Sequence, residues 1–179
     1  MLWDCLPLVE EAVEDVDVIA ISHPHYYTAM VETAERLDAR VLLHEADRAW
    51  VMRPSPRIEH WSGERLRLSD ALELVHLGGH YAGATVCHWR DGRSGRGALL
   101  SGDIVHVVAD RDWVTFMWSY PNMIPLPAHE VSRMRAVLDT LAFDRVYGAW
   151  WDTVVTEDAK AKVLRSADRY VDAVTTGRH

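Results

Sequence analysis

The chain has 179 residues and a formal net charge of −8, with 49% apolar and 26% charged residues. This composition is typical of a soluble globular domain with a substantial core. The acidic balance argues against a nucleic-acid surface, and two cysteines argue against a disulfide framework. No apolar run is long enough to span a membrane, and the N-terminus has no signal-peptide pattern. We therefore expect a single cytoplasmic domain covering residues 1–179, without nucleic-acid or membrane partners.

The first third of the sequence predicts alternating strands and helices. Apolar runs predict strands at 2–6, 18–21 and 41–44, and helices are expected from Pro7, at 27–37 and at 45–52. This alternation predicts an α/β unit with parallel or mixed strand pairing.

After a Pro-rich turn at 53–56, the pattern changes to short strands, expected at 58–61, 66–68, 72–77, 85–89 and 98–101. We interpret these strands as an antiparallel meander, with residues 91–97 as a hairpin-like loop. The aromatic, Pro-rich segment 113–127 predicts an ordered flap.

Two helices close the predicted order of elements. The first covers residues 128–141, and a strand with its loop follows at 145–151. Thr156 is expected to cap the last helix. The buried face of that helix is predicted to carry Val163, Ala167, Tyr170, Val171 and Val174.

Four side chains stand on loops that follow predicted strands. His23 and His25 flank Pro24 after the second strand, His80 lies in a Gly-rich turn, and Asp103 follows an apolar strand. If these strand ends converge, three imidazoles and a carboxylate form a metal site that suits zinc or non-haem iron. His106, three residues after Asp103, is a spare candidate ligand.

These motifs resemble the metallo-β-lactamase superfamily. His23-Pro24-His25 matches the start of its His-x-His-x-Asp-His motif, residues 79–85 match its Gly-His turn, and Gly102-Asp103 matches its strand-ending Gly-Asp. The resemblance covers nearly the whole chain. It implies an α/β fold of the αββα sandwich type, lacking the usual first strands.

The chain departs from that family at several ligand positions. Tyr27 stands in place of the motif's Asp, Thr28 in place of its next His, and Trp150 lies near its final His. The resemblance therefore implies at most one divalent metal ion, with zinc favoured over iron or manganese. His23, His25, His80 and Asp103 are the expected ligands.

Further roles are assigned to residues near these motifs. Asp103 and Tyr27 are candidate catalytic residues, the latter as a proton donor or anion-binding group. A pocket is expected to include Thr28, Trp118, Trp150 and Trp151. Trp150 and Trp151 are also expected to pack in the space of the lost second metal site.

The resemblance implies a mononuclear metal-dependent hydrolase that attacks an ester, thioester or amide of a small molecule through metal-activated water. A non-catalytic binding module on the same scaffold is one alternative. A mononuclear iron enzyme like the sulfur dioxygenases, with His23, His80 and Asp103 as ligands, is another.

The start of the chain also departs from the family, whose members usually have further strands before the position of Leu2. A shortened or misassigned start is one explanation. The other is a partner that covers the exposed sheet edge, which leads us to expect a homo-oligomer formed through that edge.

Overall fold

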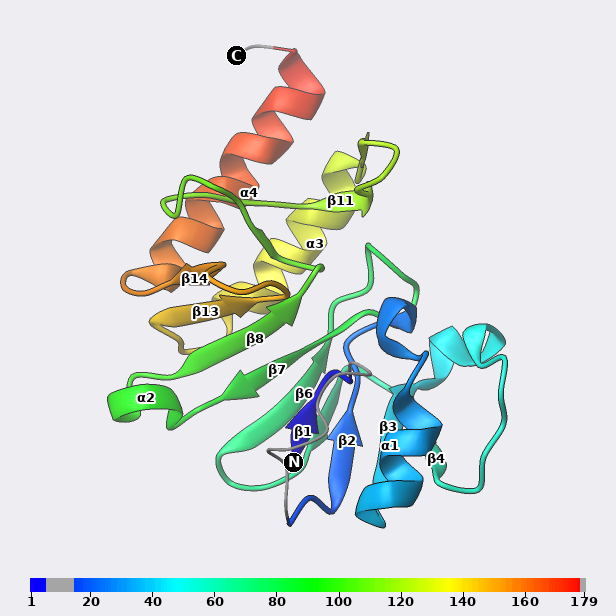
Figure 1. The fold of residues 1–179 in the computed structure, drawn as a ribbon. Helices are drawn as coiled ribbons and strands as arrows, with labels where there is room; N and C mark the ends of the chain where they lie inside the picture. Colours follow the sequence, from blue (N-terminus) through cyan, green and yellow to red (C-terminus); the bar gives the residue numbers. More distant parts are fainter. Residues whose placement is uncertain (6–14, 178–179) are drawn as a thin grey trace.

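The computed structural model describes residues 1–5 and 15–177, in which two β-sheets face each other (Figure 1). The helix expected from Pro7 lies outside the described residues. The first sheet is parallel throughout. Its strands, in spatial order, are β1 (Leu2–Trp3), β2 (Val18–Ala20), β3 (Arg40–His44) and β4 (Ile58–Trp61).

The second sheet is mixed, because β13 pairs with β8 in parallel while its other strands pair antiparallel. Its spatial order is β14 (Val154–Val155), β13 (Arg145–Gly148), β8 (Ala98–Gly102), β7 (Thr85–Trp89), β6 (Leu72–His76) and β5 (Arg65–Arg67).

Helices cover the outer faces of both sheets. In Figure 1, α1 lies against the first sheet, whereas α3 and α4 lie together over the second. The helices are η1 (Pro24–Tyr26), α1 (Met30–Leu37), η2 (Glu45–Trp50), α2 (Gly92–Gly95), α3 (Ala128–Asp139) and α4 (Ala159–Thr176), with η marking 3-10 helices. Within the described chain, no helix combines the length and apolarity needed to cross a membrane.

The alternation of side chains along the strands creates the layers. In β3, Val41 and Leu43 belong to the cluster packed against α1, whereas Leu42 belongs to the cluster between the two sheets. In β6, Leu74 faces the space between the sheets and Val75 joins the cluster that contains α3 and α4. Successive strand residues point to opposite faces, so these clusters establish the αββα order expected from the sequence.

The segment that was expected to be a flap forms short antiparallel strands. These are β10 (Val114–Thr115), which pairs with β9 (His106–Val107) outside the segment, and β11 (Met117–Ser119), which pairs with β12 (Ile124–Pro125). The β11–β12 hairpin places the Met117 backbone next to His80. The flap is therefore positioned to cover one side of the candidate metal site.

Several sequence expectations need correction. Strand 58–61 does not belong to an antiparallel meander, because β4 pairs in parallel with β3 in the first sheet. The loop at 91–97 contains the short helix α2. Asp158 rather than Thr156 precedes α4 as its N-cap residue, and Val174 on that helix is exposed. A short strand β14 follows β13 and was not expected, because two valines are too few to show a period.

Candidate metal centre

The side chains of the candidate metal centre lie where strands of the two sheets end. His23 and His25 follow β2, His80 lies in the turn between β6 and β7, and Asp103 follows β8. One ligand atom from each residue lies within 4.8 Å of the others. The fold thus brings together the four residues that the sequence singled out as ligands, here called the four-residue cluster.

A backbone hydrogen bond and a glycine hold the loops of the two sheets together at this place. The Thr85 N–H donates to the Ser22 carbonyl over 2.9 Å. Gly102 has a φ of +52°, and a Cβ there would lie 2.7 Å from Ser22 Oγ. Glycine adopts this conformation without strain and leaves room for the approach. The Gly-Asp pair therefore ends β8 where Asp103 can face His23.

His80 presents a lone pair to the cluster because its other ring nitrogen is already used. Nδ1 lies 3.1 Å from the Met117 carbonyl, which can only accept, so Nδ1 carries the proton. Nε2 is buried and has no hydrogen-bond partner among the described residues. Burial, with a smaller contribution from nearby His23, lowers the pKa of His80 to about 4. At pH 7 the ring is therefore neutral, the form that binds metals.

A chain of hydrogen bonds from the end of β1 orients His23. The Ser22 hydroxyl and N–H donate to the two carboxylate oxygens of Asp4, over 3.0 and 2.7 Å. The same hydroxyl oxygen lies 2.8 Å from His23 Nδ1 and can accept its proton. Burial lowers the pKa of His23, which favours the neutral ring. This assignment leaves Nε2 as the ligand atom.

His25 is the exposed member of the cluster, with 47% of its side chain accessible. Its Nδ1 lies 3.0 Å from His23 Nε2 and 3.9 Å from Asp103 Oδ2. Its Nε2 lies 3.0 Å from the hydroxyl of Tyr81, which can accept the Nε2 proton when Nδ1 binds a metal. Tyr81 thus orients the one ligand that burial does not hold in place.

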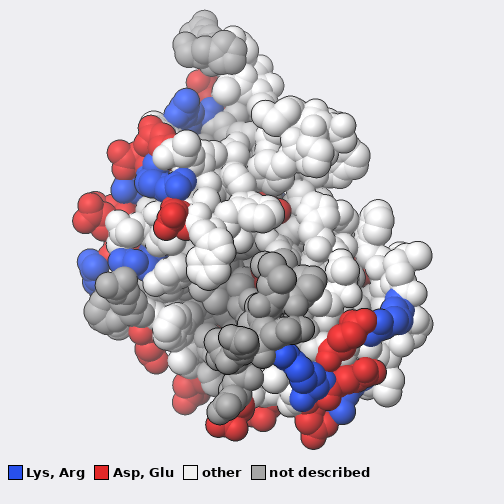
Figure 2. Space-filling model, viewed as in Figure 1, with Lys and Arg blue, Asp and Glu red and all other residues white. Residues whose placement is uncertain are grey.

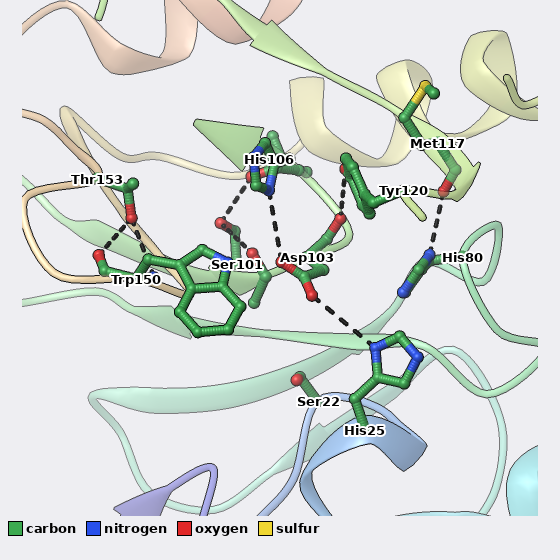
Figure 3. A network of polar contacts seen from close by, with 12 residues as sticks. Ser22, His25, His80, Ser101, Asp103, His106, Met117, Tyr120, Trp150 and Thr153 are labelled. Carbon is green, nitrogen blue, oxygen red and sulfur yellow. Dashed lines mark hydrogen bonds and ion pairs between the residues drawn. The ribbon is translucent and has the colours of Figure 1, made fainter. Parts of the chain in front are cut away.

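The two carboxylate oxygens of Asp103 have different neighbours. Oδ2 lies 3.7 Å from His23 Nε2, whereas Oδ1 lies 3.4 Å from His106 Nδ1. Figure 3 shows Asp103 between His25 and His106, with the Tyr120 hydroxyl donating to the Asp103 carbonyl over 2.9 Å. Burial alone would raise the pKa of Asp103, but the nearby imidazoles of His106 and His23 hold it well below its ordinary value. The carboxylate is therefore ionised.

The donor set fits one divalent metal ion. Imidazole nitrogens with a carboxylate suit zinc, and also iron or manganese. Ligand atoms around a tetrahedral zinc ion lie about 3.3 Å apart, so separations of up to 4.8 Å close with small side-chain rotations. The buried Nε2 of His80 supports this fit most directly, because a metal would supply the partner that the atom lacks.

Tyr27 and Thr28 lie in the wall of a neighbouring cavity. That cavity has a volume of about 350 Å³ and is also lined by Trp50 and Tyr81. Burial raises the pKa of Tyr27 far above its ordinary value, so its hydroxyl stays protonated. Among the described residues, no hydrogen bond or ion pair joins Tyr27 or Thr28 to the four-residue cluster. A catalytic role for Tyr27 stays a prediction.

The tryptophans near the site differ in their surroundings. Trp118 lines a cavity of about 390 Å³ together with His25 and His80. Trp150 is 60% exposed, and Figure 3 shows it on the other side of Asp103 from His80. Trp151 is 96% exposed, so the expectation that it packs in the space of a second metal is wrong. Its place on a tight turn, where Trp150 hydrogen-bonds Thr153 over 3.1 Å, directs it to solvent.

Sequence reasoning missed Ser22, Tyr81 and Tyr120, which contact members of the cluster, and Asp4, which contacts Ser22. Asp4 fell inside the strand expected at 2–6, and only the structure shows that β1 ends at Trp3, directly before it. Ser22 and Tyr81 adjoin predicted ligands but have no distinctive chemistry of their own. The spare candidate His106 contacts Asp103 and is not a member of the cluster.

Sequence comparison finds one similar protein whose function is not described. No protein-family model matches the chain. The chain is 46% identical over 183 residues to the uncharacterized protein YmaE of Bacillus subtilis (strain 168). The aligned region covers 98% of this chain and 66% of YmaE. The chain thus spans slightly less than two thirds of that relative.

Solved structures of metallo-β-lactamases superpose on most of the chain. A B3 metallo-β-lactamase with an active-site glutamic acid gives a TM-score of 0.60 at 15% identity, covering 92% of this chain and 72% of its own. TTHA1623 in a di-iron-bound form gives 0.56 at 23% identity, covering 86% and 75%. The di-zinc class B3 enzyme LRA-12 from an Alaskan soil metagenome gives 0.51 at 16% identity, covering 89% and 70%. The protein therefore has the metallo-β-lactamase fold.

Proposed function

We propose that the protein is a mononuclear metal-dependent hydrolase that cleaves an ester, thioester or amide of a small molecule. The observation that supports this most strongly is the buried, unpartnered Nε2 of His80, directed at a cluster of donors within 4.8 Å. Structural relatives hold zinc or iron in pairs, as the LRA-12 and TTHA1623 structures are described. Here we propose one ion, because Tyr27 and Thr28 offer no imidazole or carboxylate.

A divalent metal held by His23, His25, His80 and Asp103 would supply a bound water of lowered pKa and would polarise the substrate carbonyl. Hydrolysis then adds one water across the carbonyl–heteroatom bond, giving an acid and an alcohol, thiol or amine. The chain's own part would be to hold one ring nitrogen each of His23, His25 and His80 close to the same point. Ser22, Tyr81 and the Met117 carbonyl contact the other ring nitrogens of these three histidines.

Asp103 is the residue of the cluster suited to handle the water proton. Its carboxylate is ionised, and its Oδ2 faces the imidazole nitrogens while Oδ1 is held by His106. A carboxylate in this position can either ligate the metal or accept a hydrogen bond from the attacking water. Tyr120 fixes the Asp103 backbone through its carbonyl, which limits the movement of this side chain.

The test begins with metal content. The protein, purified without chelator, is expected to contain about one equivalent of zinc, iron or manganese, measured by inductively coupled plasma mass spectrometry. Zinc-loaded protein should hydrolyse 4-nitrophenyl acetate, and His80→Ala should abolish both metal and turnover. The surface variant His129→Ala, on an exposed position of α3, is the matched control.

Less than a tenth of an equivalent, with no uptake on addition, would contradict the metal site. Metal uptake without turnover of any ester, thioester or amide would favour a binding module. Oxygen consumption by the anaerobically iron-loaded protein with a persulfide would favour the dioxygenase alternative.

A further inference from the structure

The exposure of the cluster shows from which side a substrate reaches it. His23, His80 and Asp103 are buried, whereas nearly half of the His25 side chain is accessible. The cavity of about 390 Å³ lies on this open side, because His25 and His80 both line it. A group attached to the scissile carbonyl must therefore occupy this cavity.

The described lining of the cavity is largely aromatic, and its only titratable groups besides Tyr81 are the two histidines. Trp50, Tyr81 and Trp118 are its large side chains, and Ser119 and Asn122 are the polar residues beside the two histidines. None of its described lining residues is Lys, Arg, Asp or Glu. In a chain with 26% charged residues, this composition favours an uncharged ligand.

Two of these rings expose apolar surface at the cavity mouth. Trp50 is 53% exposed and Trp118 is 55% exposed, although indole rings are seldom left in water without a role. Figure 2 shows no charged side chain over the β11 region that carries Trp118, whereas charges crowd the left and lower edges of this face. Exposed indole rings in a cavity wall can stack against a flat ligand.

The neighbouring cavity is lined by a cation, but that cation is already paired. Arg53 lines the cavity of about 350 Å³ and forms an ion pair with Glu32. Trp50 and Tyr81, packed edge to face at 5.4 Å, stand between the two cavities. An anionic group in the cavity at the histidines would therefore meet no lysine or arginine among the described lining residues.

We infer that the substrate carries a flat, uncharged, apolar group next to its scissile carbonyl, which stacks between Trp50 and Trp118. The Asn122 amide can pair with one polar atom of that group. The volume of about 390 Å³ is near the lower end of ligand cavities, about 300 to 1,000 Å³, so the group has the size of a bicyclic ring or less. This inference rests on the proposed function in one respect, because a substrate with a scissile carbonyl implies hydrolysis. The cavity itself is formed by the chain and does not depend on that function.

Binding of a neutral probe tests the inference without catalysis. Isothermal titration calorimetry of 2-naphthalenemethanol should show saturable binding to chelator-treated and zinc-loaded protein alike. Naphthalene-2-sulfonate, with the same ring and a charge, should bind the chelator-treated protein at least about tenfold more weakly. Trp118→Ala should weaken binding of the alcohol about tenfold. Trp89→Phe, at the far end of β7, should leave it unchanged.

Absent binding, equal binding of both probes, or binding unaffected by both Trp118→Ala and Trp50→Ala would overturn the inference. A second readout separates it from the proposed function. If zinc-loaded protein hydrolyses no ester yet binds the alcohol as expected, the proposed function fails and the cavity assignment stands. The zinc-loaded protein could instead hydrolyse 2-naphthyl acetate and glyceryl acetate with equal kcat/KM. If Trp118→Ala also leaves the ratio of these two kcat/KM values unchanged, the cavity assignment fails and the proposed hydrolysis stands.

Discussion

Two neighbouring parts of the same loop, His23 with His25 and Tyr27 with Thr28, differ in their contacts with the cluster. At His23 and His25, each ring has a ligand nitrogen facing the cluster and a second nitrogen held by Ser22 or Tyr81. A few residues further on, Tyr27 and Thr28 line a cavity and make no described polar contact with the cluster. The difference shows that a metal site consists of ligands together with the groups that orient them.

The charge of the cluster also favours one divalent ion over two. Two of the imidazoles are buried and neutral, and the one ionised carboxylate of the cluster balances a single cation better than two. Tyr27 adds a hydroxyl that burial keeps protonated, so it contributes no negative charge. A second divalent ion would therefore lack both ligands and charge compensation.

The largest expected effect comes from removing a buried ligand. His80→Ala should weaken zinc affinity by more than about 100-fold, because loss of a ligand exceeds the 10- to 100-fold cost of losing a group that orients one. Competition with a chromophoric chelator measures the affinity. His129→Ala should match the wild type, and an unchanged affinity in His80→Ala would show that the metal lies elsewhere.

The stability of the chelator-treated protein should fall on acidification because of His80. The unfolded chain binds a proton there near pH 6.5, whereas burial lowers the pKa in the folded state to about 4. The contribution of the neutral ring is therefore complete above pH 6.5 and declines as the pH falls toward 4. At pH 5 the loss is about 2 kcal/mol.

Urea denaturation of chelator-treated wild type and His80→Gln at pH 7 and pH 5 isolates this contribution. The wild type should lose about 2 kcal/mol more than the variant between these pH values. Equal losses would mean that the folded protein protonates His80 as readily as the unfolded chain does.

The sequence could predict the four residues that meet at the cluster because each stands beside a local marker of a strand end or tight turn. His23 and His25 flank a proline after an apolar run, and the glycines beside His80 and Asp103 mark tight approaches at strand ends. The αββα order followed from the same motifs. Strand β4 was assigned to the wrong sheet because its apolar pattern cannot distinguish a parallel partner such as β3 from an antiparallel one.

The orienting residues could not be predicted in the same way. Asp4 and Tyr81 act through contacts across 18 and 56 positions of the chain, which no local pattern records. The exposure of Trp151 had a similar cause, because a turn and not hydrophobicity decides where its ring points. Local chemistry thus identified the four residues of the cluster, and tertiary contacts alone identified the residues that orient them.

A smaller effect should follow from removing the hydroxyl that orients His25. Tyr81→Phe keeps the ring contacts with His23 and Trp50 but loses the 3.0 Å contact with His25 Nε2. Zinc affinity should fall about tenfold, within the range for such orienting groups. Tyr147→Phe, on β13, is the matched control, and an unchanged affinity in Tyr81→Phe would show that the metal alone orients His25.

The smallest effect is expected when the missing ligands are put back. The triple variant Tyr27→Asp, Thr28→His, Trp150→His should bind a second zinc ion, but far more weakly than the first. Thr28 and Trp150 are exposed, so the new imidazoles would lose side-chain freedom on binding and have no partner comparable with Ser22 or Tyr81. Two steps in a calorimetric zinc titration would support this view. Two sites of equal affinity would contradict it, since ligands alone would then suffice and the groups that orient them would matter little.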